Sequence, residues 1–429
     1  MVAVDKTTWK QSFQKGMTLI ELMIALTLGL LIMTALTALF VEVSRSTQEM
    51  AKTTSQIESA RFAMKILTDD LQHAGFWGGF IPEWDDFTLD DAPSDAPDGL
   101  PDICANFSTQ VGDLDNLLAI PVQLYNAVPS SCSSLLSNKV PGSDVLVVRH
   151  AGTCDYNFNG SAWAAGEWDD NDTNFISNPN CPAYSSAEAY FQVSRCEAEI
   201  DIGQRVQLSD DGNYFNNNAS LQNRICDSAG GTVDTLERAP IYRYVQNIYY
   251  LRSCSVENNG NCIDNIPTLV RFEFDSSQNP PYSNAQPLVD GIEMLKFSPI
   301  LDVLSDSGAA ITDLNTTTSD PTTSDPYLDK IQWVDDEYRD SAINRGDGIP
   351  DTVKATCGAS CNYEELAHIV GIRISLLARA TQESTGYTNS KKYVVGSQLV
   401  DPSPDDGFKR NVYTKTVRLH NVSGRRVNP

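Results

Sequence analysis

The sequence predicts an α+β protein, in which a long N-terminal α-helix packs against a mainly antiparallel β-sheet globular domain with large loop insertions. Two observations support this prediction. The chain begins with a nearly continuous apolar segment that passes into a helical periodicity, and most of the remainder consists of short β-rich runs between Asn-, Ser-, Gly- and Asp-rich stretches. The 429 residues then divide into a leader (1–16), a transmembrane helix (17–43), its amphipathic continuation (44–80) and a disulfide-rich β domain (81–429).

The apolar segment is long enough to cross a bilayer. It extends from Gly16 almost to Val43, and about 20 apolar residues suffice for a span. The leader before it carries three lysines and one acid. By the positive-inside rule, residues 1–16 face the cytoplasm and the chain after Val43 lies outside.

One carboxylate, Glu21, interrupts this segment. A charge inside an apolar helix costs roughly 2.5–3.5 kcal/mol on insertion scales, so we expect Glu21 to have a function; the alternative is a plain membrane anchor with an incidental acid. The expected cleavage point, between Gly16 and Met17, lies before the apolar segment, whereas an ordinary secretory signal is cut after it. Cleavage there would leave the membrane helix on the mature protein.

The helix is expected to continue beyond the membrane. Ile57, Ala60, Met64, Leu67 and Leu71 recur three and four residues apart, which predicts one helical stripe packed on the domain's own sheet. Phe62 and Ile66 widen that face. No proline interrupts residues 17–80, and the glycines at 75, 78 and 79 are expected to end the helix.

The β domain contains six clear strand-like runs, and its long polar stretches are expected to be loops. Residues 82–101, 163–180 and 311–327 are the polar stretches. The predicted strands are 144–149, 241–252, 269–274, 292–297, 368–378 and 412–422.

All ten cysteines follow the apolar segment, in the part of the chain expected to be exported. An even number of cysteines in an oxidising compartment favours disulfides over zinc, and no zinc-knuckle spacing is present. Cys254/Cys262 and Cys357/Cys361 are close enough to close small loops. The pairing of the other six stays open at this point: Cys104, Cys132, Cys154, Cys181, Cys196 and Cys226.

The chain carries a formal net charge of −25, which argues against broad binding to a phosphate backbone. No catalytic constellation is found, so an enzyme is not expected. The four histidines are scattered and are expected at helix ends or strand surfaces; they are His73, His150, His368 and His420.

A short segment around Asp347 and Asp351 is similar to part of an Asp/Gly-rich calcium loop, in which oxygen ligands alternate around a glycine turn. An ordinary acidic turn is the alternative, since Arg345 occupies a position where such loops usually place a ligand. No cofactor is expected, with calcium at this segment as the one exception.

The N-terminal pattern resembles the type III signal of type IV prepilins and pseudopilins, through Gly16, the hydrophobic residue after it, and Glu21 as the fifth mature residue. Met17 departs from the phenylalanine usual in the family. Several segments resemble PilW-type minor pilins of the type IV pilus in their order along the chain. These are 59–64, 69–76, 143–149, 288–293, 369–377 and 416–421.

The resemblance implies cleavage after Gly16 by prepilin peptidase, N-methylation of Met17, and pairing of Glu21 with the amino terminus of a neighbouring subunit. It implies a pilin-like domain and a subunit that primes pilus assembly near the tip, in support of twitching motility, adhesion or DNA uptake. The implied partners are other minor and major pilins and the inner-membrane assembly machinery. The chain would start in the bacterial inner membrane with its C-terminal domain periplasmic, and end in the pilus at the cell surface.

Three rival interpretations are kept. The first is a pseudopilin of a type II secretion system, which the same signal also fits. The second is a pilus-anchored adhesin that makes contact through residues 155–235 and 300–365. The third, an anchored secreted enzyme, has no motif behind it.

Overall fold

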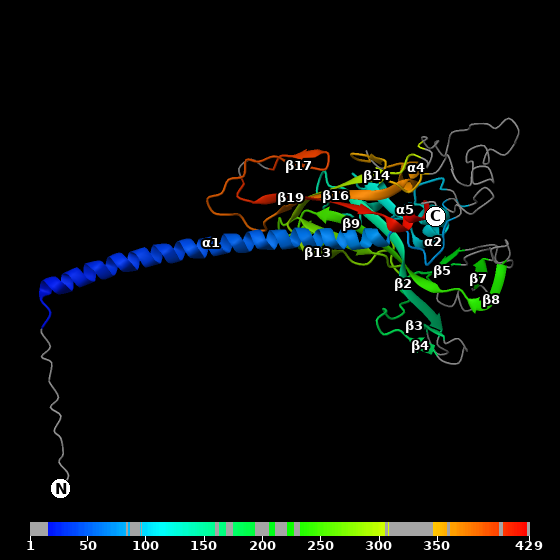
Figure 1. The fold of residues 1–429 in the computed structure, drawn as a ribbon, viewed down its shortest axis with the longest axis horizontal. Coiled ribbons are helices and arrows are strands. Elements are labelled where there is room, and N and C mark those ends of the chain that lie inside the picture. Colours follow the sequence, from blue (N-terminus) through cyan, green and yellow to red (C-terminus); the bar gives the residue numbers. More distant parts are fainter. Residues whose placement is uncertain are drawn as a thin grey trace, which may run out of the picture. The chain divides into compact units, whose positions relative to one another are not determined.

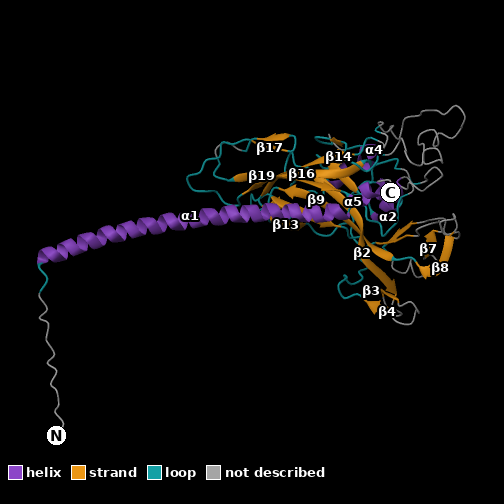
Figure 2. Cartoon of the chain, viewed as in Figure 1, coloured by secondary structure: helices purple, strands orange, loops and turns teal. Residues whose placement is uncertain are grey.

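A computed structural model describes residues 16–82, 85, 95, 97–158, 163–168, 175–193, 206–210, 221–226, 232–304, 308, 346–357, 361–402 and 406–426. The chain forms two compact units, residues 1–54 and 55–429. The second unit contains the last part of the long helix, two larger antiparallel sheets, and several short hairpins and helices (Figures 1 and 2). The predicted α+β class is therefore confirmed.

Helix α1, Leu19–His73, is continuous over 55 residues. It ends where the sequence predicts a stop, since Gly75 adopts a φ of +74°, which ordinary side chains avoid. The helix therefore ends before residue 80, the predicted end of its amphipathic continuation, and residues 74–80 form turns and irregular backbone. A Cβ at Gly75 would also lie 3.0 Å from both Arg425 and Val422, so packing favours glycine there as well.

The buried face of α1 differs in part from the predicted stripe. Ala60, Met64, Leu67 and Leu71 are buried as expected, together with Gln56, Ala63 and Thr68. Phe62 is instead 53% exposed, because two residues correspond to about 200° of helical rotation and place it opposite Ala60. Ile57 is 38% exposed.

The larger sheet is antiparallel, with the strand order β13-β12-β9-β2-β3-β4, and β1, β5 and β6 pair at its side. Its long central strands, β2 and β9, pair through Leu146↔Tyr249 and Val148↔Asn247. The bounds are β1 Val122–Tyr125, β2 Val145–Phe158, β3 Trp163–Trp168, β4 Phe175–Ser177, β5 Tyr190–Val193, β6 Val206–Ser209, β9 Ile241–Arg252, β12 Thr268–Glu273 and β13 Gln286–Asp290.

The second sheet has the order β15-β14-β16-β19. Its strands are β14 Ile292–Leu301, β15 Thr352–Val353, β16 Ile369–Arg379 and β19 Arg410–Arg418. Three small hairpins complete the strands: β7 Gln222–Cys226 with β8 Thr232–Arg238, β10 Glu257–Asn258 with β11 Asn261–Cys262, and β17 Tyr393–Val395 with β18 Gln398–Val400. The short helices are α2 Phe107–Val111, α3 Leu114–Ala119, η2 Ser130–Cys132, α4 Tyr363–Ala367 and α5 His420–Arg426.

One hydrophobic core unites the helix with both sheets. It contains Leu67 of α1, Leu146 of β2 and Ile374 of β16, all fully buried. Asp144, just before β2, links the sheets directly, because its carboxylate accepts Lys296 Nζ over 2.7 Å and the Phe297 N–H over 2.9 Å. Burial raises the pKa of Asp144, because the loss of water around its carboxylate outweighs the opposite effect of these two partners.

Two element predictions are wrong. Residues 163–180, expected as a loop, contain β3 and β4. β3 pairs with the end of β2 and β4 pairs with β3, and this pairing stabilises a segment that has no clear strand pattern of its own. Residues 412–422, expected as one strand, leave the sheet after Arg418 and turn into α5. Most of residues 82–101 and all of 311–327 lie outside the described residues.

Candidate functional site

The N-terminal segment is built around a reciprocal pair of hydrogen bonds between Thr18 and Glu21. Oε2 of Glu21 accepts the Thr18 N–H over 3.0 Å and the Thr18 hydroxyl over 2.9 Å, while the Glu21 N–H donates to Thr18 Oγ1 over 3.3 Å. This is a capping box, which satisfies donors left unpaired at a helix start. The sequence carries the signature of this box, Thr-x-x-Glu, at residues 18–21, and the charge of Glu21 alone does not reveal it.

Gly16 and Met17 lie immediately before this box, are exposed and precede the first helical residue. A Cβ added at Gly16 would meet nothing within 4 Å. Packing within the described chain therefore does not require glycine at this position. Both Thr18 bonds end on the same oxygen of Glu21, so Oε1 can accept a further donor.

The helix that follows presents an apolar surface on every side. None of its most apolar stretch is buried, so by length and composition α1 can span a membrane. The hydroxyls of Thr27, Thr34 and Thr37 donate to carbonyl oxygens one turn earlier, over 2.8–3.0 Å. These polar groups are therefore satisfied without water.

Four disulfides cross-link the described residues of the globular unit: Cys104–Cys132, Cys154–Cys181, Cys254–Cys262 and Cys357–Cys361. The last two are the small loops that their spacing predicts, and the first two settle pairings that the sequence left open. Cys196 and the side chain of Cys226 lie outside the described residues.

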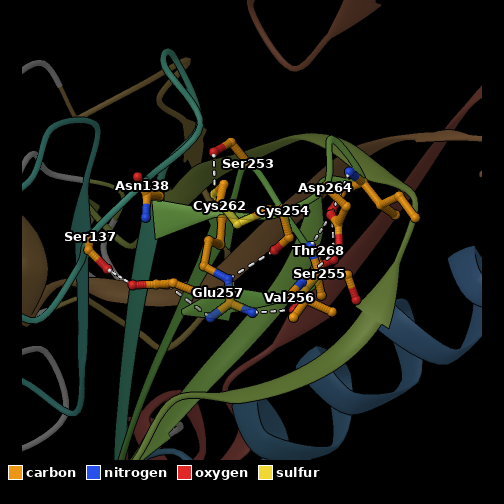
Figure 3. The surroundings of a disulfide bond; sticks show 12 residues. Ser137, Asn138, Ser253, Cys254, Ser255, Val256, Glu257, Cys262, Asp264 and Thr268 are labelled. Atoms are coloured by element: carbon orange, nitrogen blue, oxygen red, sulfur yellow. Dashed lines mark hydrogen bonds and ion pairs between the residues drawn. A yellow bond between two sulfur atoms is a disulfide. The ribbon is translucent and has the colours of Figure 1, made fainter. Parts of the chain in front are cut away.

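The Cys254–Cys262 bridge holds a compact hairpin against the sheet (Figure 3). Glu257 accepts Ser137 Oγ over 3.1 Å and pairs with Arg252 over 3.2 Å. On the other side, Asp264 accepts the N–H groups of Ser255 and Val256 over 2.8 and 2.9 Å. Covalent and polar contacts thus fix the same short segment.

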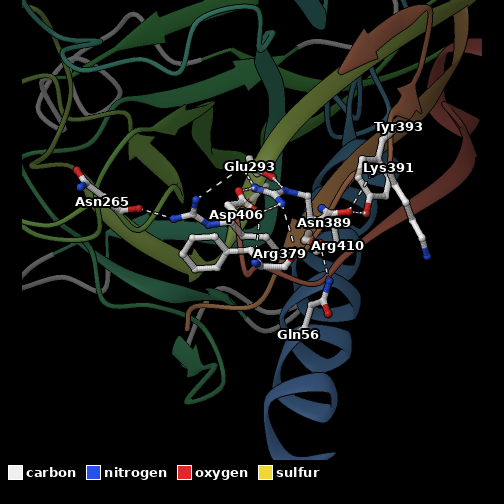
Figure 4. A network of polar contacts seen from close by, with 11 residues as sticks. Gln56, Asn265, Glu293, Arg379, Asn389, Lys391, Tyr393, Asp406 and Arg410 are labelled. Carbon is white, nitrogen blue, oxygen red and sulfur yellow. Dashed lines mark hydrogen bonds and ion pairs between the residues drawn. The ribbon is translucent and has the colours of Figure 1, made fainter. Parts of the chain in front are cut away.

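A second polar network ties α1 to the second sheet (Figure 4). Gln56 donates to the carbonyl oxygen of Ala378 over 2.6 Å. Next to it, the buried guanidinium of Arg410 pairs with both Glu293 and Asp406 at 2.5 Å. These charge-assisted bonds fix the segment after β16 against β14.

The C-terminal helix is anchored by buried charges. Arg426, 1% exposed, pairs with Asp85 over 2.9 Å and with Asp302 over 3.3 Å. Burial raises the pKa of Asp302 to about 6, although the neighbouring guanidinium of Arg426 acts to lower that pKa. His368 lies beside Arg426, and burial lowers its pKa to about 3. His368 is the C-terminal cap of α4, so it lies at a helix end, one of the two places expected for it, but it is only 8% exposed.

The other histidines lie apart from this cluster. His150 Nε2 lies 3.1 Å from Oδ1 of Asp70, and the His73 and His150 rings are 5.5 Å apart, in a groove of about 490 Å³ at the end of α1. His420 begins α5 and is exposed.

Asp347 and Asp351, the predicted calcium ligands, are engaged with backbone groups. Asp347 Oδ1 accepts the Ile349 N–H over 2.8 Å, and Asp351 Oδ2 accepts two N–H groups of residues 303 and 304 over 2.8 Å. Among described residues, no group of three or more His, Cys, Asp or Glu side chains is placed to hold a metal. Residues 309–345, with the acids just upstream, lie outside that part, so calcium binding stays a prediction.

Two family models match the chain. One, described as Type IV Pilus-assembly protein W, covers residues 248–421, and the other, the Prokaryotic N-terminal methylation motif, covers residues 11–37. No curated protein and no solved structure matches. The two matches support a PilW-type type IV pilin, in agreement with the resemblance seen in the sequence.

Proposed function

We propose that this chain is a non-enzymatic minor pilin that helps to prime type IV pilus assembly and is located at or near the pilus tip. The observation that carries the proposal is the combination, in one chain, of the methylation motif with a helix whose apolar surface is exposed throughout residues 19–43. Such a surface needs lipid or other apolar helices around it. The match to a pilus-assembly family over residues 248–421 supports the same role.

Processing would begin on the cytoplasmic face. Prepilin peptidase would cut between Gly16 and Met17, and the new amine of Met17 would be methylated. Glu21 would then pair through Oε1 with the amino terminus of a neighbouring pilin, while Oε2 remains in its own capping box. A buried charge is tolerable mainly when it is paired, so this contact would favour one stagger between subunits.

Deletion of the gene, with complementation, tests the function. We expect the deletion strain to lose surface pili and twitching, and the intact chain to restore both. Secretion of type II substrates, measured in the same strains, separates the pilus from the secretion role: normal pili with impaired secretion would favour the pseudopilin. The two segments that an adhesin would use for contact, 155–235 and 300–365, lie only partly within the described residues. Binding of the chain to cells or matrix would test the adhesin interpretation.

A further inference from the structure

The outer edge of the second sheet is a long strand with one neighbour. All nine residues of β19 pair with β16, from Arg410↔Arg379 to Arg418↔Gly371, without a register shift. In the part of the chain that the structure describes, no other strand pairs with β19. Among the described residues, its second edge therefore has no strand partner.

Two hydrogen bonds fix which backbone groups point outward. Leu419 N–H donates to the Val370 carbonyl over 2.8 Å, and Ala380 N–H donates to the Lys409 carbonyl over 3.0 Å. Pairing alternates along an antiparallel strand, so the odd-numbered residues turn toward β16. The N–H and C=O groups of Val412, Thr414 and Thr416 then point away from the sheet.

The other ends of the two sheets carry features that discourage strand addition. β13 contains Pro287 and a register shift, β15 has two residues, β4 has three, and β1 and β6 have four each. β19 is regular, and Val412, Thr414 and Thr416 are β-branched and exposed. Among these ends, only β19 combines length, regularity and exposure.

The charge at this edge selects the kind of partner. Arg373 and Arg418 lie on one face of the β16–β19 pair and Lys415 on the other, and all three are exposed. Arg418 donates to Ser423 Oγ and to the Gly348 carbonyl oxygen over 2.9 Å. None of the three has a carboxylate partner among described residues. They stand out on a chain with a net charge of −25. Like charges directly opposite each other destabilise a strand pair, so a second copy of β19 is disfavoured and a strand bearing Asp or Glu is favoured.

We propose that the outer edge of β19 accepts an extended, acidic strand from a neighbouring pilin subunit, which adds to the sheet. This rests on the proposed function, since the partner is a subunit of the same assembly. Main-chain hydrogen bonds supply the attraction in strand addition, and side chains supply the selectivity. Here the even-numbered backbone groups bind the incoming strand, and the three cations select its acidic side chains.

Photo-crosslinking in piliated cells tests this interface with the full chain. A photoreactive residue at Thr416 should give a product with another pilin, and mass spectrometry should place the link in an extended segment that bears Asp or Glu. The same group at Val394, which is 64% exposed on β17, serves as the surface control and should not give that product.

Two backbone variants sharpen the test. Thr414→Pro removes one outward N–H and spares the bonds to β16, so the yield at position 416 should fall roughly 2- to 10-fold. Thr414→Val removes the same hydroxyl but keeps the N–H, and should leave the yield unchanged. Lys415→Glu should lower the yield without any backbone change, which covers the case in which the proline variant fails to fold.

A product with a second copy of this chain, a link to a helix, or a yield unaffected by both Thr414→Pro and Lys415→Glu would overturn the interface. Piliation of the deletion strain is scored separately. If that strain loses its pili while the crosslinked product is unaffected by Thr414→Pro and Lys415→Glu, the strand addition is rejected and the proposed function is kept.

Discussion

Thr18 and Glu21 bind each other in both directions: the Thr18 hydroxyl donates to Glu21 Oε2 over 2.9 Å, and the Glu21 N–H donates to Thr18 Oγ1 over 3.3 Å. Glu21 caps its own helix through Oε2, and the neighbour contact proposed above would use its other oxygen, Oε1. A side chain that caps its own helix is also held in one conformation before a partner arrives, which lowers the entropy cost of that contact.

The two roles of Glu21 can be separated with two variants. Glu21→Ala removes cap and charge, and we expect a protein that is made, cleaved and membrane-bound but captures fewer partner pilins and lowers piliation. Thr18→Val keeps the carboxylate and removes only the hydroxyl of the cap, at a cost of about 0.5–2 kcal/mol to the helix start. It should capture more partner pilins than Glu21→Ala does, with only a small loss relative to the parent chain, because the carboxylate is kept but is less firmly held. The measurement is co-purification of pilins from detergent extracts, and equal loss in both variants would assign Glu21 to capping alone.

Cleavage should occur between Gly16 and Met17. Mass spectrometry of the mature protein should show N-methyl-Met17 as the first residue, and Gly16→Val should accumulate the uncut form. Because a Cβ at Gly16 meets no atom of this chain within 4 Å, the variant should still fold and insert. A mature terminus beyond Val43 would refute the prepilin interpretation.

The disulfides should differ in their contribution to stability. In the chain-entropy model, a bridge that closes a longer loop stabilises more. Cys104–Cys132 spans 28 residues and Cys254–Cys262 spans 8, so replacing the first pair by serine should cost about 1 kcal/mol more free energy of unfolding than replacing the second. Urea unfolding measures both, and thiol labelling of the denatured, unreduced protein should find little free thiol. The opposite ranking would show that local contacts around Glu257 outweigh loop entropy.

Asp302 and His368 should give the domain opposing pH dependences. The pKa of His368 is lowered to about 3, so its contribution to stability is complete above about 6.5 and is lost as the pH falls below that value. The pKa of Asp302 is raised to about 6, so its contribution is complete below about 3.8 and is lost as the pH rises through 6.

As the pH falls from 7 to 5, the Asp302→Asn variant should therefore lose stability more steeply than the parent chain. The His368→Gln variant should lose it less steeply. Urea midpoints of the three proteins at pH 7, 6 and 5 measure the difference. Parallel curves for all three would mean that neither group titrates in this window.

Several features follow from the sequence because their physics is local. An apolar run, a helical period and a glycine stop predicted α1, and the observed end at His73 lies two residues before Gly75. The strands near 145, 241, 268, 292 and 369 were found from their own composition. The oxidised cysteines were expected from their place after the apolar segment, and short separation gave two of the pairs.

Tertiary structure decided the rest, because those features depend on residues far apart in sequence. Strand β3 pairs with the end of β2, and β4 pairs with β3, so both short strands depend on partners that their own composition does not reveal. His368 is buried by Arg426, 58 residues later, and Gln56 reaches Ala378 across 322 residues. The free edge of β19 likewise depends on where the sheet ends. Sequence periodicity reports which face of an element is apolar, whereas the partner of each face is set by packing over the whole chain.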